Sequence, residues 1–222
     1  MTPAEKLPIV VLVSGSGSNL QAIIDAAAAG LPVEIRAVIS NKPGAYGLDR
    51  GRKASIPTRV LEHTAFEDRD TYDQALVKLI DEYQPALVIL AGFMRILTAG
   101  FVTHYQGRLL NIHPSLLPKY RGLHTHKRVL EAGDREHGAT VHLVTEELDG
   151  GPRLLQVSVP VQENDDEDTL AARVLTQEHI IYPMVIGWFA ENRLSIQNGA
   201  IALDGERMDG PKQMTFNQTT AL

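Results

Sequence analysis

Two polar side chains that could act on a substrate, the amide of Asn111 and the imidazole of His113, lie two residues apart in an otherwise apolar segment. If residues 109–113 form a strand, alternation places both polar groups on one face. Pro114 lacks a backbone donor and disfavours helical geometry at His113, so we expect the strand to end there. Ligands bind at this carboxyl edge in open α/β sheets. A strand with two polar residues on a solvated face is the alternative.

A carboxylate suited to work with this imidazole is found at Asp149, which precedes Gly150 and Gly151. Beside an imidazole, a carboxylate raises the imidazole pKa, fixes the ring orientation and can relay a proton. Asp-Gly pairs are also common in ordinary surface turns. A catalytic carboxylate and a plain turn therefore both remain open for Asp149.

A turn rich in glycine and serine, residues 14–19, joins the strand predicted at 9–13 to a helix that starts near Leu20. Strand, glycine turn and helix in this order offer free N–H groups and a positive dipole end to a phosphate. The third glycine of a G-x-G-x-x-G fingerprint would fall at Leu20, and the next strand, 33–39, is followed by Ser40 rather than an acidic residue. One phosphate is a better prediction than a dinucleotide, and a plain turn is the alternative.

Strands and helices alternate along the chain, which predicts an α/β fold with a mostly parallel twisted sheet, right-handed crossovers and helices on both faces. We expect strands at residues 9–13, 33–39, 58–61, 86–91, 109–113, 139–144 and 154–161. We expect helices at residues 20–29, 46–54, 68–83, 127–132 and, after an acidic start at 165–168, a last long helix.

The last third of the chain carries four further expectations. The strand at 139–144 alternates and should be half-buried. Pro183 should kink or interrupt the last helix. Residues 194–203 should form a hairpin around Asn198-Gly199. The polar tail from about Gly210 should be mobile.

Glu178 falls within the apolar stripe of the last long helix, in the row that contains Leu170, Val174 and Ile181. A carboxylate is costly to bury without a partner, so we expect Glu178 to face a polar cavity, for instance to hold an amine. The alternative is a carboxylate at the rim of the stripe that reaches water.

The loop at residues 92–97 is apolar for an exposed connection. It is either part of the core or a wall for a flat, partly apolar ligand whose polar edge meets Arg95. His124 and His126 have a spacing that a metal could use, but no third ligand is near in sequence. We therefore expect a polar loop over the ligand and no metal site.

Composition limits the class of protein. The chain has 222 residues, 44% hydrophobic, a net charge of −6 with scattered basic residues, and no cysteine. These values predict no nucleic-acid partner, no disulfide, no thiolate metal site and no cysteine nucleophile. No apolar run approaches the roughly 20 residues that cross a membrane, and no secretion signal is evident. We expect a cytoplasmic monomer or homodimer that acts on small molecules.

Four motifs together resemble the phosphoribosylglycinamide formyltransferases, the folate-dependent enzymes of purine synthesis. They are Asn-Ile-His-Pro-Ser-Leu-Leu-Pro at 111–118, and the segments at 13–20, 91–97 and 148–152. The resemblance runs from about residue 9 to 203, and the first motif is the most specific to folate-dependent formyl transfer. It implies a Rossmann-like formyltransferase fold, with a catalytic domain at 9–203, an extension at 1–8 and a tail at 204–222. Residues 9–106 would form the phosphate-binding half, and 107–203 the catalytic and folate-binding half.

The resemblance also implies direct transfer of the formyl group from 10-formyltetrahydrofolate, as co-substrate, to the amine of phosphoribosylglycinamide without a metal. By the matching positions, the catalytic residues are Asn111, His113 and Asp149. The positions that match the phosphoribosylglycinamide site are Gly17, Ser18, Asn19, Leu175, Thr176, Gln177 and Glu178. Those that match the folate site are Arg69, Met94, Arg95, Ile96, Leu97, Asn111, Thr145, Glu146, Glu147, Leu148 and Asp149.

One residue departs from the pattern: Arg121 stands where many members of this family carry proline. A basic residue before glycine there also resembles methionyl-tRNA formyltransferase, which adds a basic carboxyl-terminal domain. A formyltetrahydrofolate deformylase would need an amino-terminal regulatory domain, whereas the first strand begins at Ile9. Length and acidic charge favour the small-molecule transferase. A non-catalytic nucleotide-binding module is opposed by the co-occurrence of Asn111, His113 and Asp149.

Overall fold

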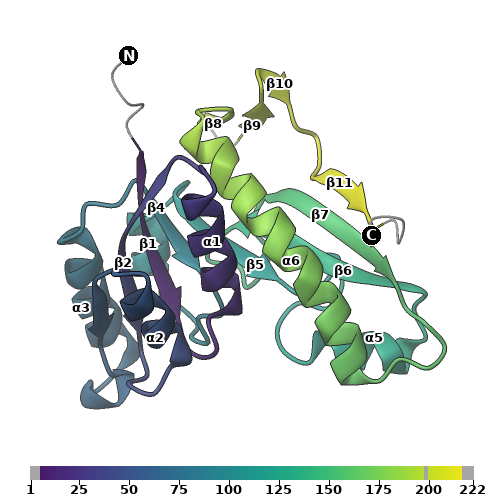
Figure 1. Cartoon of the computed structure of the whole chain (residues 1–222), viewed down its shortest axis with the longest axis horizontal. Coiled ribbons are helices and arrows are strands. Elements are labelled where there is room, and N and C mark those ends of the chain that lie inside the picture. The colour runs from purple at the N-terminus through teal and green to yellow at the C-terminus, as the bar shows by residue number, and fades with distance from the viewer. Residues whose placement is uncertain (1–5, 198–199, 217–222) are drawn as a thin grey trace.

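The computed structural model describes residues 6–197 and 200–216, and its main feature is an eight-stranded sheet (Figure 1). In chain order its strands are β1 (Leu7–Val13), β2 (Val33–Ser40), β3 (Thr58–Val60), β4 (Leu87–Leu90), β5 (Leu109–His113), β6 (Glu136–Leu143), β7 (Arg153–Pro160) and β11 (Lys212–Thr215). Across the sheet they lie in the order β11-β7-β6-β5-β4-β1-β2-β3. The strands from β1 to β5 are parallel to their neighbours within this group, whereas β6 is antiparallel to β5 and β7. The predicted mostly parallel α/β sheet is confirmed.

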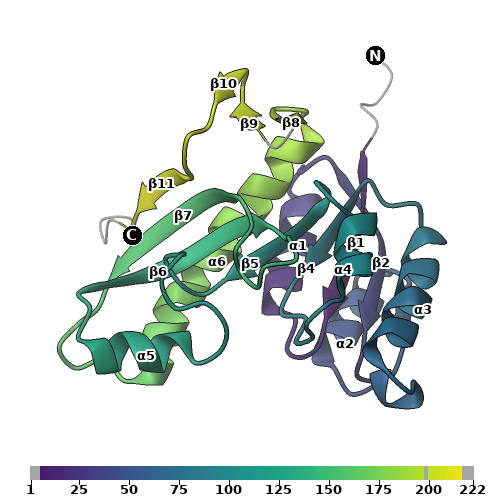
Figure 2. The same ribbon diagram turned by 180° about the vertical axis from the view of Figure 1, so that it is seen from behind.

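Helices cover both faces of this sheet, as Figures 1 and 2 show. They are α1 (Ser18–Ala28), α2 (Tyr46–Lys53), the 3-10 helix η1 (His63–Ala65), α3 (Arg69–Asp81), α4 (Ala99–His104), α5 (Thr125–Ala132) and α6 (Glu167–Ala190). Val11 of β1 belongs to the core under α1, α2 and α6, and Leu12 belongs to the core under α3 and α4. Because β1 is buried on both faces, its sequence is an unbroken apolar run rather than an alternating one.

The carboxyl ends of β1, β4 and β5 meet at one edge of the sheet. Leu12 pairs with Leu90, and Leu90 pairs with Asn111. The turn after β1, the loop after β4 and the end of β5 therefore lie side by side, as the parallel order predicted.

The strand predicted at residues 139–144 is confirmed as part of β6, but the expectation that it is half-buried is wrong. Every residue of β6 after Glu136 is buried. The segment after His113 crosses one face of β6: the Thr140 hydroxyl donates to the Ser115 carbonyl at 2.6 Å and accepts from the Leu117 N–H at 3.2 Å. Thr140 thus finds its polar partners inside the protein instead of in water.

The tail is also more ordered than its composition suggested. β11 pairs in parallel with β7, with Met214 opposite Val157, so the expected mobility is wrong for residues 212–215. A second, three-stranded sheet contains β8 (Leu194–Gln197), β9 (Ala200–Leu203) and β10 (Glu206–Arg207). The antiparallel pair β8 and β9 confirms the predicted hairpin strands, while Asn198-Gly199 lies outside the described residues, as do residues 1–5 of the predicted extension and 217–222 of the tail.

The last long helix is continuous. Pro183 does not interrupt α6, which is anchored on the sheet one residue earlier by the Tyr182 hydroxyl, near the carbonyls of Leu90 and Leu110. Sequence reasoning missed α4, because six residues are too few to show a helical repeat. Among the described residues, no helix is long and apolar enough to cross a membrane.

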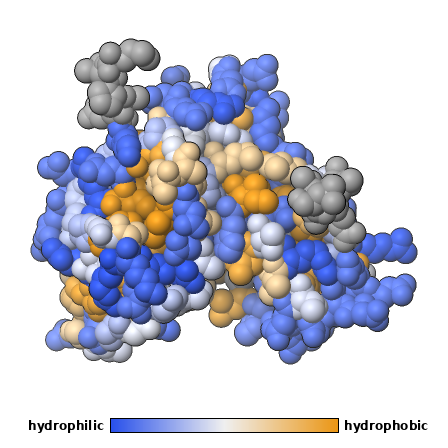
Figure 3. Space-filling view, in the orientation of Figure 1, coloured by the Kyte–Doolittle hydropathy of each residue, from blue (hydrophilic) through white to orange (hydrophobic). Residues whose placement is uncertain are grey.

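The face of the molecule that carries α6 is mostly hydrophilic, and separate apolar areas interrupt the hydrophilic surface (Figure 3). On α6 itself, Ile180 and Met184 are exposed, whereas Leu170, Val174 and Ile181 are fully buried against the sheet. The helix is therefore apolar toward the sheet but also carries apolar side chains on its exposed face.

Candidate active site

The imidazole of His113 and the carboxylate of Asp149 lie together at the carboxyl edge of β5. His113 Nδ1 is 3.5 Å from Asp149 Oδ2, and each side chain is only 8% exposed. Asp149 follows the buried strand β6 and has a positive φ of 49°, an uncommon backbone conformation for a residue other than glycine. The predicted pairing of imidazole and carboxylate is confirmed, and Asp149 is not a plain surface turn.

The loop after β5 folds back over this pair with two backbone groups. His113 Nε2 lies 2.9 Å from the Tyr120 carbonyl, which can only accept, so Nε2 carries a proton. The Gly122 N–H donates to Asp149 Oδ2 at 2.9 Å. The same loop therefore fixes the ring of His113 and the carboxylate of Asp149.

A third polar group, His142 on β6, completes the arrangement. His142 Nδ1 lies 2.9 Å from the Leu143 carbonyl and so carries the ring proton. The other nitrogen, Nε2, then accepts from Asn111 Nδ2 at 3.1 Å and lies 3.7 Å from Asp149 Oδ1. Burial lowers the pKa of His142, which keeps this nitrogen an acceptor. One hydrogen of the Asn111 amide is thereby directed at His142.

Sequence reasoning did not assign His142 a role. It lies opposite Asn111 in the antiparallel pair of β5 and β6, and paired residues point to the same face. The alternation of residues 139–144 was visible in the sequence, but the register that places His142 beside Asn111 was not.

The turn after β1 has the form predicted for a phosphate site. Gly17 caps α1 with a φ of 67°, and a Cβ at this position would come within 2.6 Å of the Gly47 Cα. The turn is held from α2, because the Gly47 N–H donates to the Gly15 carbonyl and Arg50 Nε donates to the Ser16 carbonyl. Only glycine fits at position 17, and the free N–H groups of α1 begin directly after it.

Glu178 meets this turn from α6. Its Oε2 accepts from Asn19 Nδ2 at 2.7 Å, and the residue is 6% exposed. Burial raises the pKa of Glu178, and the bond from Asn19 opposes that shift. Glu178 is thus buried with a polar partner, so the alternative of a carboxylate reaching water is wrong, while the polar cavity expected in front of it stays a prediction. Of the neighbouring candidates, Gln177 is buried, Leu175 is partly buried and Thr176 is exposed.

The loop after β4 contributes some side chains to the core and exposes others, so neither of the two alternatives for this loop holds for all of its residues. Phe93 is buried and Leu97 packs against the same core, whereas Met94 and Ile96 are 64% and 60% exposed. The guanidinium of Arg95 lies 4.6 Å from the centre of the Tyr72 ring, so it stacks on α3. The loop therefore presents two apolar side chains at the site's edge.

The remaining folate candidates are exposed. Leu148 is 53% exposed, and Thr145, Glu146 and Glu147 are also exposed. Arg69 is exposed at the first position of α3. Arg121 forms an ion pair with Glu147, which joins the loop over His113 to the loop before Asp149.

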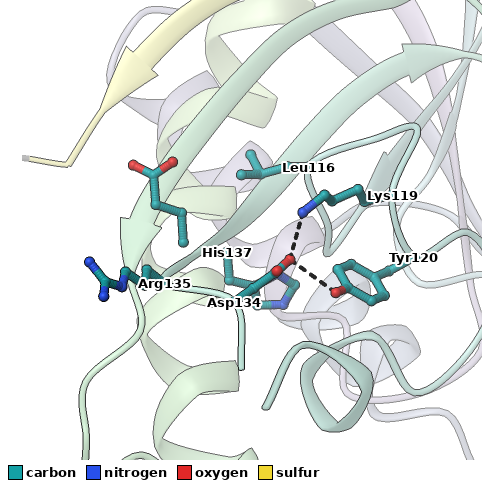
Figure 4. A pocket seen from close by; sticks show the side chains of 7 residues that line it. Leu116, Lys119, Tyr120, Asp134, Arg135 and His137 are labelled. Atoms are coloured by element: carbon teal, nitrogen blue, oxygen red, sulfur yellow. Dashed lines mark hydrogen bonds and ion pairs between the residues drawn. The ribbon is translucent and has the colours of Figure 1, made fainter. Parts of the chain in front are cut away.

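The segment that carries Tyr120 also lines a cavity of about 420 Å³, shown in Figure 4. Lys119 and Tyr120 both donate to Asp134 Oδ2, at 2.8 and 2.9 Å. The Tyr120 carbonyl contacts His113, so Asp134 helps to hold the segment that orients the imidazole. His126 pairs with His137 at 3.0 Å rather than with His124, and the described residues contain no group of three metal-ligating side chains.

Known proteins resemble this chain over most of its length. A model of the formyl transferase family matches residues 7–186. Phosphoribosylglycinamide formyltransferase of Escherichia coli is 60% identical over 201 residues, covering 90% of this chain and 95% of the relative. The chain belongs to the phosphoribosylglycinamide formyltransferases.

Other members of this formyltransferase family are similar to this chain in sequence and in structure. The enzyme of that name from Haemophilus influenzae is 48% identical over 95% of this chain and 99% of its own. The solved structure of the Coxiella burnetii phosphoribosylglycinamide formyltransferase superposes with a TM-score of 0.90 at 52% identity, covering 96% of this chain and all of the other. The Rossmann-like formyltransferase fold that the resemblance implied is thereby confirmed.

Proposed function

We propose that this chain transfers the formyl group from 10-formyltetrahydrofolate to the amine of N1-(5-phosphoribosyl)glycinamide, giving the N-formyl product and tetrahydrofolate in purine biosynthesis. Family membership supports the reaction. The convergence of Asn111, His113 and Asp149 at the edge shared with the glycine-serine turn is the observation that carries it. Because both reactants are small molecules held at one sheet edge, much of the rate comes from holding them in attack geometry.

Binding of the glycinamide substrate is assigned to the turn and to α6. The phosphate would meet the N–H groups that follow Gly17, at Ser18 and Asn19, where the helix dipole is positive. Leu175, Thr176, Gln177 and Glu178 supply the other contacts, since Glu178 reaches Asn19 directly. These positions would leave the glycinamide amine to extend toward β5.

Binding of the folate is assigned to the loops that follow β4 and β6, the two strands that neighbour β5 in the sheet. Met94 and Ile96 offer exposed apolar surface for the flat ring, with Arg95 and Leu97 holding the loop. The second wall consists of Thr145, Glu146, Glu147, Leu148 and Asp149, and Arg69 is the further folate contact. The formyl group would then lie between Asn111 and His113.

The chemical step follows from the donors at that point. The amine lone pair attacks the formyl carbon, a C–N bond forms, and the carbonyl electron pair moves to oxygen. The second hydrogen of the Asn111 amide and the Nδ1–H of protonated His113 can stabilise this oxyanion. The 3.5 Å separation from Asp149 leaves that Nδ1–H weakly bonded and therefore available to the formyl oxygen.

Asp149 completes the proton balance. Its carboxylate is placed to take the proton that the attacking nitrogen must lose. When the oxyanion collapses, the bond from the formyl carbon to folate N10 breaks, and N10 takes up the proton that Asp149 accepted from the amine, so no net proton is gained or lost. No step of this sequence requires a metal or a redox change.

We further propose the coarse organisation that the sequence suggested. Residues 9–203 contain the catalytic domain, with a phosphate-binding half at 9–106 and a catalytic and folate-binding half at 107–203, and its sheet also includes the start of β1 at Leu7 and β11 (Lys212–Thr215) from the tail. The continuous pairing of β4 with β5 across that division supports a single domain. We expect it to work in the cytoplasm as a monomer or homodimer.

The test is direct. The protein is mixed with phosphoribosylglycinamide and a 10-formyl folate, and release of the deformylated folate is followed by absorbance. Release that depends on the amine substrate is expected. No amine-dependent signal would reject the transferase, and a signal with water alone would favour a hydrolase.

A further inference from the structure

Ser14 joins three segments of the sheet edge through one buried hydroxyl. It is the first residue after β1 and therefore the first residue of the glycine-serine turn. Its Oγ accepts from the Met94 N–H at 2.8 Å and donates to Asn41 Oδ1 at 2.6 Å. Its own N–H donates to the Gly92 carbonyl at 3.1 Å. The phosphate turn is thereby tied to the loop after β4.

The bond to Met94 lies beyond the ordinary strand pairing. The register of β1 with β4 ends at Leu12 and Leu90, and Gly92 then turns away with a positive φ of 73°. Among the hydrogen bonds of the described residues, the Met94 N–H donates to the Ser14 hydroxyl. Without that hydroxyl, the partly buried Met94 N–H would lose its hydrogen-bond partner within the protein.

Asn41 fixes the direction of the Ser14 hydroxyl. Asn41 follows β2 and is 2% exposed. Its Oδ1 accepts the hydrogen bond from the Ser14 hydroxyl, so the lone pairs of Ser14 Oγ are free to accept from the Met94 N–H. A hydroxyl otherwise rotates freely to suit its neighbours. The buried amide of Asn41 therefore makes Ser14 an acceptor toward the loop after β4.

The far end of the same loop is held separately. The Thr98 N–H donates to the Asp73 carboxylate at 2.7 Å, and Arg95 stacks on Tyr72 of α3. Between these anchors, the apolar side chains of Met94 and Ile96 are exposed. The loop is thus fixed at both ends, and only the Ser14 end is coupled to the phosphate turn.

We propose that Ser14, oriented by Asn41, is a positioning residue that sets the separation between the phosphate turn and the folate loop. This inference rests on the proposed function, in which the turn binds the glycinamide substrate and the loop binds the formyl folate. A shift of about 1 Å in one reactant can lower the rate about 100-fold when two reactants must meet in attack geometry. Ser14 acts through the backbone at Met94 and contacts neither reactant.

The test compares Ser14→Ala with a matched control, Ser40→Ala. Ser40 is also buried at a strand end, and its hydroxyl likewise accepts a backbone N–H and donates to a carbonyl, both of Lys42. Ser40 does not join the two loops. Both variants therefore lose the same kind of buried hydroxyl, and they differ in whether the Met94 contact is lost.

Two readouts are measured on the full chain. Ser14→Ala should lower kcat/KM for 10-formyltetrahydrofolate about 10- to 100-fold, with the Kd of phosphoribosylglycinamide changed less than about twofold. Hydrogen exchange of the Met94 amide, followed by NMR, should become faster while amides within β4 keep their rates. Ser40→Ala should leave the kinetic parameters and the Met94 amide as in the wild type.

A second variant tests the role of Asn41. Asn41→Ala should give a smaller loss than Ser14→Ala, and the double variant should lose no more than Ser14→Ala, because both act through one bond. Kinetics equal to those of Ser40→Ala, or an unchanged Met94 exchange rate, would overturn the inference. A wild-type chain without amine-dependent transfer would instead overturn the proposed function, and the Met94 exchange rates would still report whether Ser14 holds the loop.

Discussion

The ring of His113 faces the carboxylate of Asp149 at 3.5 Å, and the backbone of one loop contacts both, through the Tyr120 carbonyl and the Gly122 N–H. Each side chain is 8% exposed, so little water screens the interaction between them. The pair is therefore formed before any substrate arrives. Its two members are held by backbone groups, which side-chain substitutions in the loop leave in place.

Replacing the carboxylate should separate chemistry from folding. Asp149→Asn keeps an oxygen for the Gly122 N–H but loses the negative charge and the proton acceptor. We expect kcat to fall about 10²- to 10⁴-fold, with the melting temperature nearly unchanged. His113→Ala should cause a comparable loss. Initial rates and thermal denaturation measure both effects, and a near-normal rate in either variant would contradict the assigned roles.

His142 should matter through Asn111. His142→Phe keeps a ring in the buried site but removes the acceptor that directs the Asn111 amide. Loss of that orientation should lower kcat about tenfold, less than the loss expected for removing an oxyanion donor outright. His142→Gln can still accept and should lose less. If His142→Phe turned over substrate at the wild-type rate, Asn111 would not depend on this contact.

The sequence predicted the parts of the site that local chemistry decides. Alternation in residues 109–113 placed Asn111 and His113 on one face, and Pro114 ended the strand there. The glycine-serine turn was recognised because its order between strand and helix is itself a local feature. The partner required by Glu178 was inferred from the cost of burying a carboxylate.

The parts that sequence reasoning missed depend on contacts between distant segments. The register that pairs Asn111 with His142 is set by antiparallel packing, which alternation within each strand does not specify. The loop holds His113 through the Tyr120 carbonyl, and every residue has a carbonyl. β11 was missed because a short polar strand, held by β7, has no distinctive pattern.

Acid should destabilise the protein through His137. Burial, with smaller effects from His126 and His113, lowers the pKa of His137 to about 4 from its ordinary 6.5. Between these values the unfolded chain binds a proton that the folded chain does not. The stabilisation is therefore complete above pH 6.5 and is lost as the pH falls toward 4, by about 3 kcal/mol in total.

Urea unfolding at several pH values measures this slope. In His137→Gln the fall in unfolding free energy between pH 6.5 and 4 should be smaller than in the wild type. It should not vanish, because burial also lowers the pKa values of His126, His142 and His179. An identical slope in wild type and variant would show that His137 takes up its proton equally in both states.

Arg121 should contribute little, although it departs from the family pattern. Its ion pair with Glu147 joins side chains that are 37% and 65% exposed, and such pairs are worth at most about 1 kcal/mol. Arg121→Gln and Glu147→Gln should each change the unfolding free energy by less than that amount and leave kcat within about threefold. Raising the salt concentration should reduce any difference from the wild type. A large loss of kcat in Arg121→Gln alone would mean that its guanidinium meets substrate.

Glu178 should govern binding of the glycinamide substrate rather than of the folate. Burial raises the pKa of Glu178, and Glu178→Gln keeps an oxygen that can accept from Asn19, so this variant should bind nearly as the wild type does. Glu178→Leu leaves the Asn19 amide without its partner, so the phosphate turn loses this hydrogen bond to α6. The Kd of phosphoribosylglycinamide should then rise about tenfold, equivalent to about 1.4 kcal/mol, while KM for the folate stays the same. Equal losses in both variants would show that the charge on Glu178, and not its hydrogen bond to Asn19, is what the substrate requires.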